Sequence, residues 1–119
     1  MRPPIALTIA GSDPSGGAGI QADLKTFTAL GTYGCAVLTS LTAQNTQGVD
    51  AVFTPPASFV REQLTTLLDD VYVDATKIGM IPNAEVAEVI ADVIEERRSD
   101  FGKIVLDLSL IHISEPTRL

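Results

Sequence analysis

The sequence predicts an α/β fold in which a mostly parallel sheet is flanked by helices. Short apolar segments alternate along the chain with segments of helical periodicity, and a glycine-rich turn joins the first apolar segment to the first helix. The apolar segments are apolar at consecutive positions, which is typical of strands buried on both faces. Strands that alternate with helices usually form a parallel sheet.

Five segments are expected to form strands. All are short and mostly apolar, and they are Ile5–Ala10, Ala36–Leu41, Ala51–Thr54, Thr76–Met80 and Lys103–Asp107. In a parallel sheet with right-handed crossovers, the ligand crevice lies beyond the carboxyl ends of the strands. Candidate functional residues are therefore expected to follow these segments.

Three amphipathic helices are expected between the strands. The first extends from about Gly19 to Leu30, and Gly31 is expected to end it. The second follows Pro55 and Pro56, and the third follows Asn83, a residue type that commonly caps helices. Their apolar positions recur at helical spacing. They are Ile20, Leu24, Phe27 and Leu30 in the first, Val60, Leu64, Leu67, Leu68 and Val71 in the second, and Val86, Val89, Ile90, Val93 and Ile94 in the third.

Composition excludes several function classes. The 119 residues suffice for one domain, and the formal charge of −7, from 15 acidic and 8 basic residues without a basic cluster, argues against nucleic acid or an anionic membrane as a partner. No apolar run approaches the roughly 20 residues of a membrane span. Cys35 is the single cysteine, so an internal disulfide and a cysteine metal site are excluded, and a buried structural thiol is expected. The chain is expected to be cytoplasmic.

The glycine-rich segment AGSDPSGGAGIQADLKT, residues 10–26, is the most informative part of the chain. Gly11 and Gly16 have the spacing of a P-loop, but Gly17 and Ala18 follow where that motif has Lys and Ser or Thr. A phosphate cradle of this kind is therefore excluded.

Two other interpretations of this segment remain. Gly17, Gly19 and Ala22 match a dinucleotide fingerprint, although no acidic residue lies in residues 38–44, where that fingerprint expects one. Alternatively, the turn wraps a small polar ring, with Asp13 and Asp23 bonding donors on that ring.

Four motifs follow one another along residues 5–107: AGSDPSGGAGIQADLKTFTALGTYGCAV, LTAQNTQGV, TKIGM and IVLD. Their order and spacing resemble the N-terminal half of the hydroxymethylpyrimidine/phosphomethylpyrimidine kinases of thiamine biosynthesis, a family of the ribokinase-like superfamily. The resemblance implies a ribokinase-like fold and an ATP- and Mg²⁺-dependent enzyme. It also implies phosphorylation of 4-amino-5-hydroxymethyl-2-methylpyrimidine and then of its monophosphate, by a full-length protein that forms a homo-oligomer.

The resemblance also assigns substrate-binding residues. Gln44 would read the aminopyrimidine edge, for which its amide offers both a donor and an acceptor. Asp23 would help to hold the substrate, although an Asp in a first helical turn also complements the helix dipole. Gly11 and Ala18 would line the ring with backbone and Met80 would form an apolar wall, but each is also compatible with ordinary packing.

Lys77 lies inside an apolar strand, so its amino group is expected to pair with a carboxylate or to extend to the strand end, without a catalytic role.

In the family, the nucleotide site, the anion hole with its catalytic residue and the metal-binding motif lie in the C-terminal half. The resemblance therefore implies that residues 1–108 form the substrate-binding half and that the chain alone has no catalytic residue, no metal site and no activity. Residues 109–119, SLIHISEPTRL, resemble a read-through peptide encoded by a sequencing adapter, and the lone histidine, His112, is expected to be incidental there. A pyridoxal kinase-like enzyme, a dinucleotide-binding oxidoreductase domain and a non-catalytic binding fragment remain alternatives.

Overall fold

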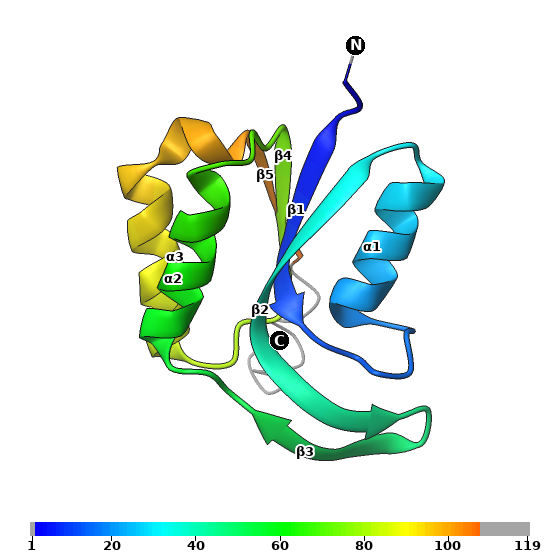
Figure 1. Ribbon diagram of the computed structural model, residues 1–119. Helices are drawn as coiled ribbons and strands as arrows, with labels where there is room; N and C mark the ends of the chain where they lie inside the picture. Colours follow the sequence, from blue (N-terminus) through cyan, green and yellow to red (C-terminus); the bar gives the residue numbers. More distant parts are fainter. Residues whose placement is uncertain (1, 108–119) are drawn as a thin grey trace.

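The computed structural model describes residues 2–107, which form a mostly parallel sheet with helices on both faces (Figure 1). The strand order is β3-β2-β1-β4-β5, in which the β2–β3 pair is antiparallel and the other pairs are parallel. Along the chain the elements are β1 (Ile5–Gly11), α1 (Gly19–Ala29), β2 (Tyr33–Asn45), β3 (Gly48–Phe53), α2 (Ala57–Leu68), β4 (Ala75–Ile78), α3 (Ala84–Glu96), the 3₁₀ helix η1 (Arg98–Phe101) and β5 (Lys103–Leu106).

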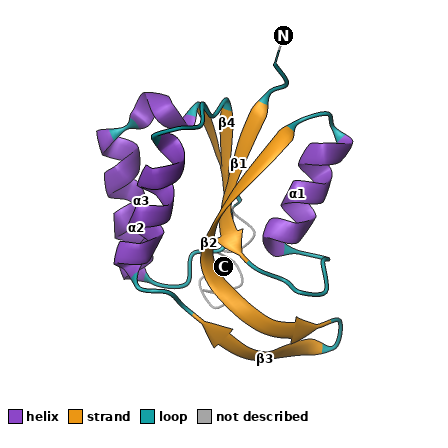
Figure 2. Ribbon diagram, in the orientation of Figure 1, coloured by secondary structure: helices purple, strands orange, loops and turns teal. Residues whose placement is uncertain are grey.

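The helices are divided between the two faces of the sheet. α1 covers one face, whereas α2 and α3 pack together on the other (Figure 2). The crossover from β1 through α1 leads to β2 on one side, and the crossovers through α2 and α3 lead to β4 and β5 on the other side. Because crossovers of the same hand that run in opposite directions place their helices on opposite faces, this layout follows from the strand order. The predicted α/β class is confirmed.

The predicted helices are present, with ends close to those expected. Asn83 caps α3, since its Oδ1 accepts a hydrogen bond of 2.9 Å from the N–H of Val86. Gly31 follows the end of α1 with a φ of 75°, in the left-handed region that a glycine adopts at low cost. The 3₁₀ helix before β5 was not predicted, and its Phe101 is fully buried.

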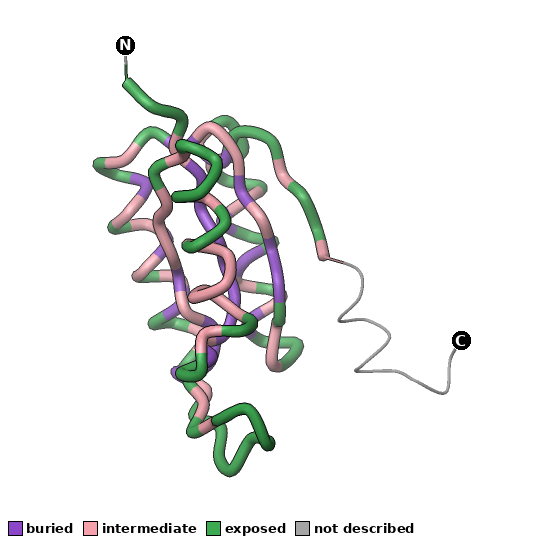
Figure 3. Tube along the Cα trace, turned by 90° about the vertical axis from the view of Figure 1, so that its right-hand side faces the viewer, coloured by how far each residue is buried: buried purple, intermediate pink, exposed green. Residues whose placement is uncertain are grey.

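The segment Ala51–Thr54 was predicted to be a buried strand of a parallel sheet; the strand is present, but its burial and its parallel pairing are wrong. Its residues 51–53 belong to β3, which pairs with β2 in an antiparallel hairpin, and all residues of β3 are exposed. Figure 3 shows the hairpin extending from the lower end of the molecule, mostly exposed. The turn is closed by Asn45, whose Oδ1 accepts hydrogen bonds from the N–H groups of Gln47 and Gly48. This short turn leaves no room for the long crossover that a parallel pair needs.

Two further expectations about burial are corrected. Leu30 was assigned to the apolar side of the first helix, but it follows the last residue of α1 and is 74% exposed. β5 was predicted to be buried on both faces, but Val105 and Leu106 are exposed because β5 is the last strand of the described sheet. Only the side of β5 that faces β4 is paired within residues 2–107.

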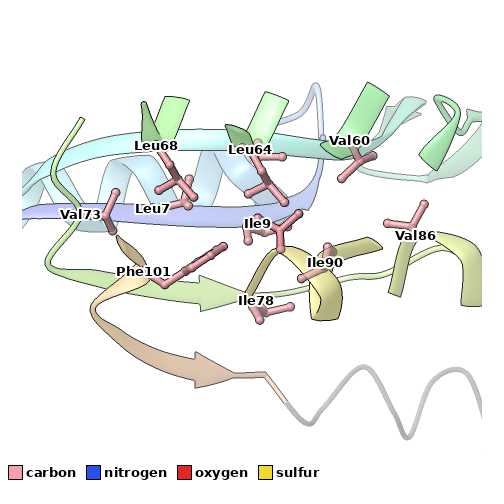
Figure 4. Packing of buried hydrophobic residues seen from close by; sticks show 12 residues of the cluster. Leu7, Ile9, Val60, Leu64, Leu68, Val73, Ile78, Val86, Ile90 and Phe101 are labelled. Carbon is pink, nitrogen blue, oxygen red and sulfur yellow. The ribbon is translucent and has the colours of Figure 1, made fainter. Parts of the chain in front are cut away.

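The hydrophobic core lies between the sheet and the α2–α3 layer. Figure 4 shows side chains of α2 and α3 meeting side chains of β1 and β4. The labelled members of this cluster are Leu7, Ile9, Val60, Leu64, Leu68, Val73, Ile78, Val86, Ile90 and Phe101. Cys35 is half-buried against the cluster, and this burial raises the pKa of its thiol.

Within residues 2–107, no helix is both long enough and apolar enough to cross a bilayer. The domain boundary predicted at residue 108, the segment 109–119 and His112 lie outside the described residues.

Candidate functional site

A cavity of about 430 Å³ opens at the carboxyl ends of β1 and β4. The chain leaves β1 toward α1 on one face of the sheet and leaves β4 toward α3 on the other, so the two loops separate at this point. Such a switch point is where open α/β sheets bind ligands, because the diverging loops leave a crevice between them. The cavity is lined by the segments that follow β1 and β4, by the first turns of α1 and by the β2–β3 hairpin.

The structure brings all the predicted substrate-binding residues to this cavity. They are Gln44, Asp23, Gly11, Ala18 and Met80. They come from the hairpin, from α1, from the end of β1 and from the loops after β1 and β4, so the fold assembles them from distant parts of the sequence. Their contact with a substrate remains a prediction.

Gln44 is held by a short chain of hydrogen bonds that begins at the loop after β1. The Oγ of Ser12 accepts from the N–H of Thr42 at 3.0 Å. The hydroxyl of Thr42 lies 3.0 Å from the carbonyl oxygen of Ser12 and 2.9 Å from Oε1 of Gln44. Because a threonine hydroxyl carries one proton, it donates to one of these oxygens at a time. Gln44 follows a bulge in β2, which changes the register of the hairpin at this residue.

Asp23 lies in the second turn of α1 and contacts the sheet. Its Oδ2 accepts from the hydroxyl of Thr8 at 2.6 Å, and the ammonium of Lys77 lies 3.0 Å from Oδ1 and 2.9 Å from Oδ2. The alternative interpretation, an acidic residue in the first helical turn, is wrong because α1 begins at Gly19 and its first turn contains no acidic residue. The expectation that Lys77 pairs with a carboxylate is confirmed.

One interpretation of the glycine-rich segment has Asp13 bond a ligand; in the structure its carboxylate lines the cavity and organises the glycine-rich loop. Oδ1 accepts from the hydroxyl and the N–H of Ser15 at 2.6 Å and 3.0 Å, and Oδ2 accepts from the N–H of Gly17 at 3.1 Å. These bonds, of which the one from the Ser15 hydroxyl has the largest effect, hold the pKa of Asp13 below its ordinary value. A phosphate group in this loop would meet a carboxylate where a P-loop offers free N–H groups. The loop is therefore unsuited to the phosphates of ATP and to the pyrophosphate of a dinucleotide.

Two glycines at the cavity allow close contacts that a Cβ would block. A Cβ on Gly11 would lie 2.6 Å from Oγ of Ser40 and 3.8 Å from Sδ of Met80. A Cβ on Gly19, which has a φ of 61°, would overlap the carbonyl oxygen of Gly11. The first residue of α1 and the last residue of β1 are thus in contact, and α1 carries Asp23 to the cavity.

Sequence reasoning missed several lining residues. Thr42, Val49 and Val52 reach the cavity from the hairpin, which was not predicted, and Asp107 reaches it from the residue after β5. Lys77 also lines the cavity; it had been noticed as a charge in an apolar strand but was not assigned to the site.

A larger hollow of about 560 Å³ lies elsewhere, between the hairpin and α2. Leu38, Phe53, Pro55 and Phe59 form much of its wall. Polar groups that converge on one point orient a ligand, and those groups are found in the cavity at the switch point. We therefore assign the candidate site to the smaller cavity.

A metal site was tested on the donors present. Within residues 2–107, no group of three or more His, Cys, Asp or Glu side chains is arranged to hold a metal ion.

Comparison with known proteins gives consistent matches. The family model described as phosphomethylpyrimidine kinase matches residues 13–116. Hydroxymethylpyrimidine/phosphomethylpyrimidine kinase of Escherichia coli (strain K12) is 52% identical over 106 residues, which are 89% of this chain and 39% of that protein. The chain therefore spans less than half the length of this relative.

Solved structures match over a similar part of the chain. A phosphomethylpyrimidine kinase from Clostridium difficile 630 has a TM-score of 0.81 at 45% identity, covering 87% of this chain and 44% of that one. A pyridoxal kinase from Bacillus subtilis, solved as an ADP complex, has a TM-score of 0.78 at 42% identity, covering 89% and 40%. The predicted ribokinase-like fold is confirmed by these two structures.

Proposed function

Because the chain belongs to the phosphomethylpyrimidine kinase family, we propose that it forms the acceptor-binding half of an ATP-dependent pyrimidine kinase. The acceptors are 4-amino-5-hydroxymethyl-2-methylpyrimidine and its monophosphate. The observation that carries this proposal is the convergence of Gln44 and Asp23 on one cavity at the switch point of the sheet.

The walls of the cavity suit a small aminopyrimidine. The amide of Gln44 offers a donor and an acceptor side by side, which complements a ring nitrogen next to an amino group. Asp23 adds an acceptor, and Val49, Val52 and Met80 add apolar surface for the faces of the ring. The volume of about 430 Å³ is sufficient for one small heterocycle.

The nucleotide is proposed to bind to residues outside 2–107. Two observations support this: the N–H groups of Ser15 and Gly17 are already bonded to Asp13, and the described residues provide no cluster of metal ligands. Phosphoryl transfer requires neutralisation of charge on the transferred group by a metal, basic residues or N–H donors. We therefore infer that this chain binds the pyrimidine without phosphorylating it.

The decisive experiment is a calorimetric titration of the chain with 4-amino-5-hydroxymethyl-2-methylpyrimidine. Gln44→Ala removes both hydrogen bonds to the ring edge and is expected to weaken binding about tenfold or more, since each buried hydrogen bond contributes about 1 kcal/mol. Gln47→Ala, an exposed glutamine in the same hairpin, is the matched control and should bind as the unaltered chain does. Absence of binding, or equal binding by Gln44→Ala, would contradict the proposal.

A second candidate ligand is pyridoxal, because a pyridoxal kinase is among the similar structures. Pyridoxal lacks a ring nitrogen next to an amino group, so it cannot use both hydrogen-bonding groups of Gln44 in the same way. Competition between the two compounds distinguishes them. We expect the pyrimidine to displace pyridoxal, and the reverse order of affinity would favour the pyridoxal kinase-like alternative.

A further inference from the structure

Lys77 is the centre of a polar cluster at the wall of the cavity, which we name the Lys77 cluster and which consists of Thr8, Asp23, Lys77 and Asp107. Its members come from β1, α1, β4 and the residue after β5. Lys77 Nζ contacts both carboxylate oxygens of Asp23 and lies 3.9 Å from Oδ2 of Asp107. The side chains of Lys77 and Asp23 are 29% and 15% exposed, so the pair is screened less than a surface pair.

The bonding pattern leaves one part of the Asp23 carboxylate available. A carboxylate has about four acceptor positions, two on each oxygen. Among the described residues, Thr8 and Lys77 occupy Oδ2, whereas Lys77 alone contacts Oδ1. Since Asp23 lines the cavity, the remaining position on Oδ1 is the one that a ligand N–H or O–H group would use.

Lys77 itself is poorly placed to bind an anionic ligand. Its charge is opposed by the carboxylates of Asp23 and Asp107, so the cluster carries more negative than positive charge. A phosphate group here would be repelled by these two carboxylates. The geometry therefore favours an indirect role for the lysine.

We propose that Lys77 is a positioning residue that fixes the Asp23 carboxylate at the cavity wall, with one acceptor position open to a donor group of the ligand. The inference rests on the proposed function, because the ligand is the aminopyrimidine acceptor. Thr8 fixes the second oxygen, so the carboxylate cannot rotate away without breaking three contacts. This arrangement favours ligands that donate a hydrogen bond over ligands that only accept one.

A double-mutant cycle tests whether Lys77 acts through Asp23. The affinity for 4-amino-5-hydroxymethyl-2-methylpyrimidine is measured by calorimetry for the unaltered chain, Lys77→Met, Asp23→Asn and the double variant. Each single change is expected to weaken binding about tenfold, and the double change about tenfold as well, because the two residues act as one unit. Arg61→Met removes a cation and its contact with Glu96 on an exposed helix surface, and it should leave the affinity unchanged.

Several outcomes would overturn the inference. If Lys77→Met binds the pyrimidine as tightly as the unaltered chain and only melts at a lower temperature, the lysine is structural. If the double variant is about a hundredfold weaker, the two effects add and Lys77 does not act through Asp23. If the unaltered chain does not bind the pyrimidine at all, the proposed function fails and the inference fails with it.

Lys77→Met leaves a carboxylate without its cation, which can prevent folding. The comparison of Asp23→Asn with the double variant avoids this problem, since neither contains that carboxylate. Equal affinities support the positioning role, and a further loss of about tenfold in the double variant contradicts it.

Discussion

Gln63 bonds both backbone groups of Leu38. Its Oε1 accepts from the N–H of Leu38 at 3.0 Å, and its Nε2 donates to the carbonyl oxygen of Leu38 at 2.9 Å. Leu38 lies in β2, ahead of the segment from Leu41 to Asn45 that pairs with β3. The side chain from α2 therefore takes the place of a neighbouring strand where β2 has not yet met its hairpin partner.

Replacing Gln63 by methionine tests this contact. The side chain keeps its length but loses both hydrogen bonds, and two half-buried backbone groups lose their partners. We expect the free energy of unfolding to fall by about 1–3 kcal/mol, measured by urea denaturation. Gln47→Met, in an exposed turn, should change stability by less than about 0.5 kcal/mol. Equal stability of the two variants would show that the contact contributes nothing.

Gly19→Ala tests the close contact between α1 and β1. The positive φ costs about 1–2 kcal/mol for an L-residue, and the new Cβ would overlap the carbonyl oxygen of Gly11. We expect lower stability and weaker binding of the pyrimidine, because α1 carries Asp23. Gly48→Ala is the control, since a Cβ there has no neighbour within 4 Å. If folded Gly19→Ala protein binds the pyrimidine with unchanged affinity, the position of α1 does not determine ligand binding.

Local signals in the sequence were sufficient for the α-helices, although not for the 3₁₀ helix η1. The cap at Asn83 and the apolar positions of α3 agree with the structure, because a helix of 13 residues is defined by contacts between near neighbours in the chain. The first strand was predicted for a different reason. β1 is central to the sheet, so its residues are buried on both faces and are mostly apolar.

The hairpin could not be recognised in the same way. β3 contains apolar residues, including Val52 and Phe53, but all residues of β3 are exposed. Apolar character therefore did not indicate burial in this strand. The signal that could have corrected the prediction is the turn sequence from Asn45 to Gly48. The pairing of Lys77 with Asp23 depends on tertiary structure, because 54 positions separate the two residues.

Asp13 makes the stability of the loop depend on pH. Hydrogen bonds lower the pKa of Asp13 in the folded chain below the ordinary value of 3.8, and the bond from the Ser15 hydroxyl has the largest effect. The stabilisation is therefore complete above the unfolded-state pKa and is lost as pH falls through the folded-state pKa. We expect the melting temperature to decrease as the pH falls below about 4, and this decrease should be smaller in Asp13→Asn. Asp74, whose pKa is lowered mainly by the N–H of Ile5, adds to the same trend.

A matched variant separates Asp13 from the general effect of acid. Asp50→Asn removes a carboxylate from the exposed strand β3 and should retain the pH dependence of the unaltered chain. If Asp13→Asn and Asp50→Asn melt with the same pH profile, the hydrogen bonds in the loop do not contribute to stability.

Thr42 is expected to set the position of the Gln44 amide. Its hydroxyl lies between the carbonyl oxygen of Ser12 and Oε1 of Gln44, and its N–H bonds Oγ of Ser12. Thr42→Val keeps the shape and the β-branched side chain that suits a strand, but it removes the hydroxyl. The Gln44 side chain must then be ordered on ligand binding, which costs about 0.5–1.5 kcal/mol and corresponds to a roughly threefold to tenfold loss of affinity. Thr42→Ser keeps the hydroxyl and should bind the pyrimidine nearly as well as the unaltered chain. Calorimetric titration of both variants checks this, and equal affinities for valine and serine at this position would show that the hydroxyl does not position the amide.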